Sequence, residues 1–186
     1  MEEYLIQQGV DGAVLRLKSG EEIAGADLAR VVEGARTFKR ILEAFPTHYP
    51  RHIIEQAALA GAFEPGRVDA DLSGTADMVA RRLDMIAREF ERGWTGRPTQ
   101  DVGIRLTRVL RGVEEVRTLD GAILRGGEAR RINQEVAATN GVFKDPSRLV
   151  RKDRETLIHG PIELLNAILE EGEKGLSLQR YKGLGE

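Results

Sequence analysis

The chain has 186 residues, 41% of them apolar, which is enough to bury the core of one large domain or two small ones. It contains no cysteine, which excludes a disulfide scaffold and a thiolate zinc site. No apolar run approaches membrane-spanning length, and the first residues lack the basic and apolar regions of a signal peptide. We therefore expect a soluble, cytoplasmic protein with no membrane partner.

Charge is distributed unevenly along the chain. The 28 basic and 30 acidic residues give a formal net charge of -2, which argues against a generic polyanion binder. Residues 1–96 hold 12 Lys and Arg against 16 Asp and Glu, residues 97–154 hold 13 against 8, and residues 155–186 hold 3 against 6. The basic middle could present one positive face to nucleic acid or form ordinary solvated surface, and both interpretations stay open.

The first half of the chain reads as mainly helical. A short helix is expected from Glu2 to Gln8 and ends at Gly9, before a turn and a strand from Ala13 to Leu17. Apolar residues recur at helical spacing from Ala26 to Phe45, which predicts the clearest helix in the sequence. A second helix is expected from Pro50 to Gly61, so that the two form a helical hairpin.

A polar loop is predicted from Glu64 to Gly74, followed by a third helix from Thr75 to Arg92. On this helix Phe90 belongs to the apolar stripe and Arg82 lies toward the outer side. The loop holds two aspartates two residues apart, a spacing that suits a divalent cation. The further ligands of a calcium loop are missing, so we assign no metal site.

After Trp94 the pattern becomes extended. A strand over residues 102–110, a tight turn at Arg111-Gly112 and a return strand from Val113 to Thr118 predict a β-hairpin. Four arginines lie on or beside it, namely Arg105, Arg108, Arg111 and Arg117. They could lie against a DNA backbone or pair with Glu114 and Glu115 across the strands, and the sequence does not choose between these roles.

The last third of the chain adds two helices and the densest positive stretch. One helix is expected from Glu128 to Thr139 after a pair of glycines, and another from Pro161 to Gly172. Between them, residues 148–154 carry four cations and a single acid. These candidate contacts to DNA or to a partner are Arg148, Arg151, Lys152 and Arg154.

The closing stretch combines a strand pattern with a basic, glycine-containing turn. Apolar and polar residues alternate from Leu176 to Gln179, which predicts a half-buried strand. The turn that follows contains Arg180, Lys182, Gly183 and Gly185. Glycines allow a phosphate or another backbone to approach closely, and the two cations place positive charge beside them.

The string QRYKGLGE, from Gln179 to Glu186, resembles the motif that closes the metal-binding TOPRIM domain of DNA gyrase B subunits and their type IIA topoisomerase relatives. The segment Gly126–Ile132 is similar to a GGEYRRI-type segment in the large insertion that Gram-negative gyrase B subunits carry inside that domain. The resemblance implies an α+β insertion domain over residues 21–175. Its helical part would extend to about residue 93, and the part from about residue 94 to 175 would contain a β-hairpin, further helices and a small antiparallel or mixed sheet. Residues 1–20 and 176–186 would be flanks of the parent domain.

The resemblance also implies a function. The chain would be an accessory domain, supporting ATP-dependent and magnesium-dependent DNA supercoiling by contacting DNA or by stabilising the assembly of the A and B subunits. Its partners would be DNA, the gyrase A subunit and the rest of gyrase B. ATP and magnesium would be held elsewhere in the parent enzyme, and this segment would have no cofactor and no catalytic residue. Arg180, Lys182, Gly183 and Gly185 would lie close to the DNA-cleavage site.

Two other interpretations compete with this one. The chain could be a free-standing protein-interaction module unrelated to topoisomerases, or a metal-dependent phosphoryl-transfer enzyme, although the latter needs a carboxylate cluster that the sequence does not offer. The insertion hypothesis makes one architectural prediction. Tyr4 and Leu178 must lie near one another, because both connect to the same small parent domain.

Overall fold

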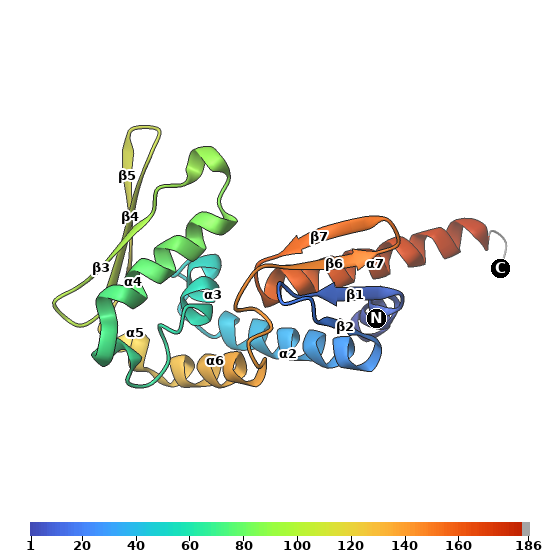
Figure 1. The fold of residues 1–186 in the computed structure, drawn as a ribbon, viewed down its shortest axis with the longest axis horizontal. Coiled ribbons are helices and arrows are strands. Elements are labelled where there is room, and N and C mark those ends of the chain that lie inside the picture. Colours follow the sequence, from blue (N-terminus) through green and yellow to red (C-terminus); the bar gives the residue numbers. More distant parts are fainter. Residues whose placement is uncertain (184–186) are drawn as a thin grey trace. The chain divides into compact units, whose positions relative to one another are not determined.

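The computed structural model describes residues 1–183, with only the backbone described at residues 68 and 69. The chain folds into α-helices and two antiparallel sheets, which confirms the predicted α+β class (Figure 1). It divides into two compact units, one formed by residues 1–39 together with the part after residue 140, and one formed by residues 40–140. No helix among residues 1–183 is long and apolar enough to cross a membrane.

The first unit contains a four-stranded antiparallel sheet in the order β2-β1-β6-β7. Its strands are β1 (Ala13–Arg16), β2 (Glu22–Ala24), β6 (Ser147–Arg151) and β7 (Arg154–Ile158). Leu15 and Leu149 lie opposite one another in the register and are buried. The basic run over residues 148–154 therefore forms a β-hairpin, a structure that its charge pattern did not predict.

Two helices at the ends of the described chain pack side by side in this unit. Helix α1 (Glu2–Val10) lies antiparallel to α7 (Pro161–Lys182). A Cβ atom on Gly9 would lie 2.0 Å from the carbonyl oxygen of Ile168, and one on Gly172 would lie 2.1 Å from that of Leu5. The prediction that these two glycines end their helices is wrong, because each instead lets the other helix approach its backbone.

The strand predicted from Leu176 to Gln179 is also absent, because these residues continue helix α7. Leu176 follows the buried residues Ile168 and Gly172 at steps of four, so that one helical face stays turned toward the rest of the unit. Leu178 is 52% exposed. The alternation of apolar and polar residues at 176–179 is too short to distinguish a strand from the end of a long helix.

The second unit combines helices with a three-stranded antiparallel sheet in the order β3-β4-β5. The strands are β3 (Thr95–Pro98), β4 (Ile104–Leu110) and β5 (Val113–Leu119). The helices are α3 (Arg51–Leu59), α4 (Arg67–Ile86), the short 3-10 helix η1 (Glu89–Glu91), α5 (Gly121–Arg125) and α6 (Gly127–Ala138). Helix α4 packs on β3, where a Cβ on Gly96 would lie 2.1 Å from the carbonyl oxygen of Ala76.

Helix α2 (Gly25–Glu43) corresponds to the helix predicted at residues 26–45, and α3 follows after a short connection. The Arg51 side chain secures this connection, since one guanidinium nitrogen donates to the carbonyl oxygens of Leu42 and Phe45 at 2.9 and 3.0 Å. Helix α3 then packs against α4 and α6. The two successive helices of the predicted hairpin are therefore present.

The polar loop predicted over residues 64–74 is partly wrong, because α4 begins at Arg67 and passes through a kink at Asp71. Asp71 has non-helical angles (φ -155°, ψ 70°), and its Oδ1 accepts a hydrogen bond from the Gly74 N–H at 2.9 Å. An aspartate in this position caps the helical segment that follows. Local backbone bonding by Asp71 thus explains why a polar stretch starts a helix.

Helix α4 ends at Ile86 instead of continuing to Arg92 as predicted. Asp84 Oδ1 accepts hydrogen bonds from the N–H groups of Gly93 and Trp94 at 3.0 and 3.1 Å. These bonds hold the chain after Ile86 in a turn that brings it back beside α4. Phe90, expected in the apolar stripe, is 66% exposed. Arg82, expected to face outward, is only 4% exposed, and its Nε donates to Gln56 Oε1 at 3.0 Å.

Candidate nucleic-acid interface

The four arginines of the β4–β5 hairpin are separated by the strand register. The hairpin forms as predicted, with Arg111 and Gly112 at positive φ in its two-residue turn. Leu106 pairs with Arg117, and Arg108 pairs with Glu115. Directly paired residues share one face of a sheet and successive residues alternate, so Arg108 and Arg117 lie on the face of buried Leu106, whereas Arg105 lies on the other face.

The arginines on the inner face, the side of the sheet that carries Leu106, are held by intramolecular partners. Arg108 donates to Glu115 Oε1 at 3.0 Å and to the carbonyl oxygen of Glu91 at 2.6 Å, and its guanidinium carbon lies 4.5 Å from the centre of the Trp94 ring. Arg117 lies 3.3 Å from Glu115 Oε2. Pairing across the strands with Glu115, one of the two roles left open by the sequence, therefore occurs for Arg108, whereas Arg117 pairs with the same carboxylate from its own strand.

His52 on α3 responds to these same charges. Desolvation lowers the pKa of the His52 imidazole below its ordinary value, and the nearby Arg108 and Arg117 lower it further, while Glu115 opposes the shift. The ring is therefore kept neutral near pH 7 and contributes no positive charge to the hairpin.

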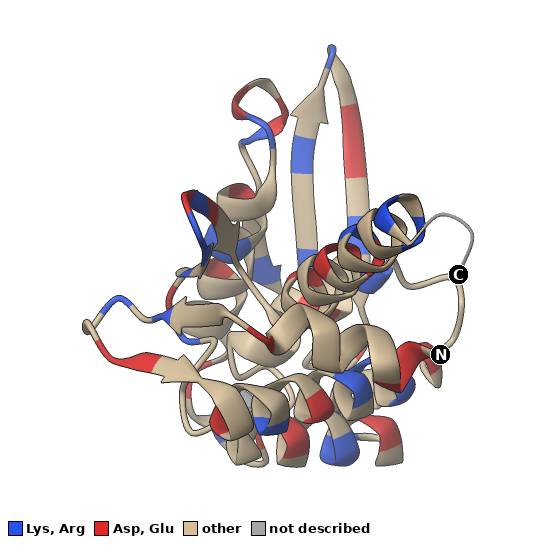
Figure 2. Cartoon of the chain, turned by 90° about the vertical axis from the view of Figure 1, so that its right-hand side faces the viewer, with Lys and Arg blue, Asp and Glu red and all other residues tan. Residues whose placement is uncertain are grey.

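The outer face, the side opposite Leu106, carries arginines with a different environment. Arg97 of β3 pairs directly with Arg105 of β4, and both side chains are exposed. Beside them, the hydroxyl oxygens of Thr95 and Thr107 lie 2.8 Å apart. Within residues 1–183, no carboxylate lies at ion-pair distance from Arg97, Arg105 or the exposed turn residue Arg111. Figure 2 shows Lys and Arg segments along the hairpin and at its tip.

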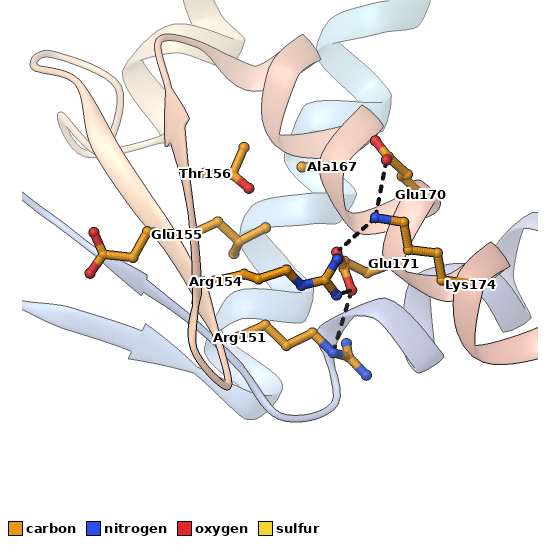
Figure 3. Close-up of a pocket in the computed structure, with 9 residues that line it drawn as sticks. Arg151, Arg154, Glu155, Thr156, Ala167, Glu170, Glu171 and Lys174 are labelled. Atoms are coloured by element: carbon orange, nitrogen blue, oxygen red, sulfur yellow. Dashed lines mark hydrogen bonds and ion pairs between the residues drawn. The ribbon is translucent and has the colours of Figure 1, made fainter. Parts of the chain in front are cut away.

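The β6–β7 hairpin holds two of its four cations in a network with α7 (Figure 3). Arg151 donates to the carbonyl oxygens of Gln8 and Gly9 at 3.2 and 2.8 Å, and its Nε lies 3.7 Å from Glu171. Arg154 lies 2.7 Å from the same carboxylate, which also receives Lys174 at 3.8 Å. These charged side chains line a pocket of 370 Å³ and tie the sheet to both packed helices.

The remaining two cations of this hairpin differ in their contacts. Arg148 lies 3.5 Å from Glu155 on the neighbouring strand. Lys152 is exposed in the turn at positive φ (56°), and no ion pair to it occurs in the part of the chain that the structure describes. Of the four cations predicted to contact DNA or a partner from residues 148–154, Lys152 is therefore the one that forms no ion pair among the described residues.

The described residues contain no group of three or more His, Asp or Glu side chains placed to hold a metal ion. In the second unit, Tyr49 and Asp120 form a structural pair with shifted pKa values. Burial and a 2.6 Å hydrogen bond from the Tyr49 hydroxyl to Asp120 raise the pKa of Tyr49 to about 12. The same bond, together with the Ile123 N–H, lowers the pKa of Asp120, which caps α5.

Comparison with known proteins accounts for the whole chain, although no family model matches it. Over all 186 residues it is 39% identical to the DNA gyrase B protein of Caulobacter vibrioides. It is 26% and 25% identical, again over its whole length, to the gyrase B proteins of Rickettsia bellii and Rickettsia prowazekii. The chain is therefore similar over its whole length to a segment of DNA gyrase B proteins. It spans 22% to 23% of the length of these gyrase B relatives.

The segment that carries the gyrase B resemblance most closely ends helix α7. Arg180 and Lys182 are exposed in its last turn, where cations interact favourably with the helix dipole, and no partner for either occurs within residues 1–183. Gly183 ends the helix, and its N–H donates to the carbonyl oxygen of Gln179 at 2.7 Å. Gly185, the fourth residue predicted near DNA from the gyrase motif, lies outside the described residues.

Proposed function

We propose that this chain is an accessory domain inserted into the TOPRIM core of a gyrase B protein. In this proposal it supports ATP-dependent DNA supercoiling by contacting DNA and by stabilising the assembly with the A subunit, and it has no active site of its own. ATP and magnesium act in other parts of the parent protein. The full-length similarity to gyrase B favours this function over a free-standing interaction module.

The observation that carries the proposal is the pairing of the two end helices. The Tyr4 hydroxyl donates to Gln179 Oε1 at 3.4 Å, and α1 packs along α7. The expected proximity of residues 4 and 178 is therefore confirmed. An inserted domain leaves and re-enters its parent at neighbouring points, and this antiparallel pair provides such an entry and exit.

The contacts described above divide the predicted DNA-binding residues into two groups. Arg108, Arg117, Arg148, Arg151 and Arg154 have partners in the fold. In the proposal these side chains hold their units together. DNA contact falls to the exposed cations without such partners among the described residues, which are Arg105, Arg111, Lys152, Arg180 and Lys182.

An excision in the full-length gyrase B protein tests the proposal. Residues 12–159 are replaced by a short Gly-Ser linker that joins α1 to α7. Since Gly9 lies beside Ile168 in an antiparallel pair, the end of α1 is offset from the start of α7 by only about six helical residues, roughly 9 Å along the helix axis. The parent fold should survive this change.

We expect the excised protein to retain its own ATP hydrolysis and to lose DNA affinity and supercoiling when it is assembled with the A subunit. The unmodified protein and a variant with the same linker inserted after residue 20 serve as controls. Supercoiling and DNA affinity equal to those of the unmodified enzyme would contradict the proposal.

A further inference from the structure

We propose that the outer face of the β3-β4-β5 sheet, defined by Arg97, Arg105 and the tip residue Arg111, binds phosphates of duplex DNA. This inference rests on the proposed function and specifies which surface of the domain meets the nucleic acid. Arg97 was not among the arginines suggested by the sequence, because only the pairing of β3 with β4 brings it opposite Arg105.

Arg97 and Arg105 form a like-charge pair that has no carboxylate partner among residues 1–183. Arg97 and Arg105 are directly opposite on neighbouring strands, where Cβ atoms lie about 5 Å apart and equal charges destabilise a sheet. Within residues 1–183 neither guanidinium has a carboxylate partner, whereas Arg108 and Arg117 on the inner face share Glu115. A bound anion would remove the repulsion.

Threonine hydroxyls accompany the arginine pair on this face. Thr95 and Thr107 place two hydroxyls beside the arginine pair, and Thr118 lies directly opposite Arg105 on β5. Arginine and threonine side chains are common donors to DNA phosphates. The residues of this face include no aromatic ring on which an unpaired base could stack, since Trp94 is buried beneath Arg108. The chemistry therefore suits a duplex backbone better than a single strand.

The β4–β5 hairpin extends well beyond the three-stranded part of the sheet. Strand β3 pairs with β4 only as far as Thr107, so the hairpin continues beyond it as a two-stranded ribbon. Arg111 at its tip is six residues from Arg105, which is about 20 Å along a strand. It adopts a left-handed conformation (φ 53°) in a turn where Asn or Gly is usual. Glu114 lies on the outer face between them, which confines phosphate contact to the base and the tip of the ribbon.

The test uses the full-length gyrase B protein assembled with its A subunit, and it measures affinity for a DNA duplex over a range of salt concentrations. Arg105→Glu places a carboxylate opposite Arg97 and so neutralises the pair. Because neither arginine then binds a phosphate, the slope of log affinity against log salt should become shallower by about two. The thermal midpoint of the domain should not fall, because a repulsive pair becomes an attractive one.

The matched control is Arg130→Glu on α6. Arg130 is exposed, and its side chain has no ion pair within the described part of the chain, so this variant makes the same change in net charge away from the sheet. Its salt slope should equal that of the unmodified enzyme. A double variant, R97T R105T, removes both cations without adding a carboxylate, and it should reproduce the shallower slope.

Three results would overturn the inference. The first is an unchanged salt slope in both sheet variants, Arg105→Glu and R97T R105T, while the excised protein loses DNA affinity. This result would leave the proposed function intact and assign DNA binding to another face. The second is a lower thermal midpoint in both variants, which would make the arginine pair structural. The third is weaker association with the A subunit at unchanged DNA affinity, which would assign this face to a protein. Unchanged DNA affinity in the excised protein would instead refute the proposed function.

Discussion

Gly9 in α1 lies directly against the backbone of Ile168 in α7, so close that a Cβ atom at residue 9 would stand 2.0 Å from the carbonyl oxygen of Ile168. One turn away, Gly172 faces Leu5 in the same manner. Helices α1 and α7 are therefore in contact through their backbones, and the contact depends on the absence of a Cβ atom at these two glycines.

Gly9→Ala should separate these helices and destabilise the chain by about 1–3 kcal/mol, since the added methyl meets rigid backbone. The matched control is Gly175→Ala in α7, where nothing lies within 4 Å of the new Cβ. This control should stabilise the chain by roughly 0.5–1 kcal/mol through helix propensity alone. Urea unfolding of the 186-residue chain measures both changes, and equal stability of the two variants would contradict the packing role of Gly9.

Arg82→Ala should destabilise the chain by about 1.5–3 kcal/mol, because it leaves the buried Gln56 carbonyl without its charged donor at 3.0 Å. Its neighbour provides the control. Arg81 is exposed, and among the described residues it forms an ion pair with Asp77 alone, one turn away, so Arg81→Ala should change stability by no more than about 0.5 kcal/mol. Comparable losses in the two variants by chemical denaturation would show that the Arg82 contact adds nothing.

Tyr49→Phe should destabilise the chain by about 1 kcal/mol at neutral pH, since Asp120 loses the hydroxyl that donates to it at 2.6 Å. The pKa of Tyr49 is raised to about 12 in the fold, so this contribution is fully present below pH 10 and is lost as the pH rises toward 12. The pKa of Asp120 is lowered, so the stability from its ionised form is present above about pH 4 and is lost in more acidic solution.

The measurement is the unfolding free energy of both proteins between about pH 7 and pH 11. The difference between the unmodified chain and the Phe variant should shrink above about pH 10, where the tyrosine of the unfolded chain ionises. A difference that stays constant over the whole range would exclude the Tyr49 hydroxyl as its source.

Arg151→Ala should destabilise the first unit by about 1–3 kcal/mol, because the carbonyl oxygens of Gln8 and Gly9 and the carboxylate of Glu171 lose a shared donor. Lys152→Ala changes the next residue, an exposed turn position, and should alter stability by at most about 0.5 kcal/mol. Since Arg151 serves the fold, Lys152 is the better position for testing DNA contact by this hairpin. Equal thermal midpoints of the two variants would contradict the stabilising role of the Arg151 contacts to Gln8, Gly9 and Glu171.

Local patterns in the sequence were sufficient, to within two residues at each end, for helices α2 (Gly25–Glu43) and α6 (Gly127–Ala138) and for the hairpin that turns at Arg111-Gly112. Each depends on neighbours within one or two turns of chain, so apolar spacing and turn residues describe it fully. The closing motif also pointed to the gyrase B family, because eight consecutive residues identify a relative without reference to packing.

Only the tertiary structure decided what several individual residues do. A glycine has the same backbone freedom whether it ends a helix or admits another helix, so Gly9 and Gly172 could be assigned only once α1 and α7 were seen together. Arg82 is buried because Gln56, 26 residues away, accepts its hydrogen bond. Likewise, Arg105 and Arg117 belong to opposite faces of one hairpin because its register pairs Leu106 with Arg117. The charge of a residue and its spacing from others can be read from the sequence, whereas the residue that it contacts is decided by the tertiary structure.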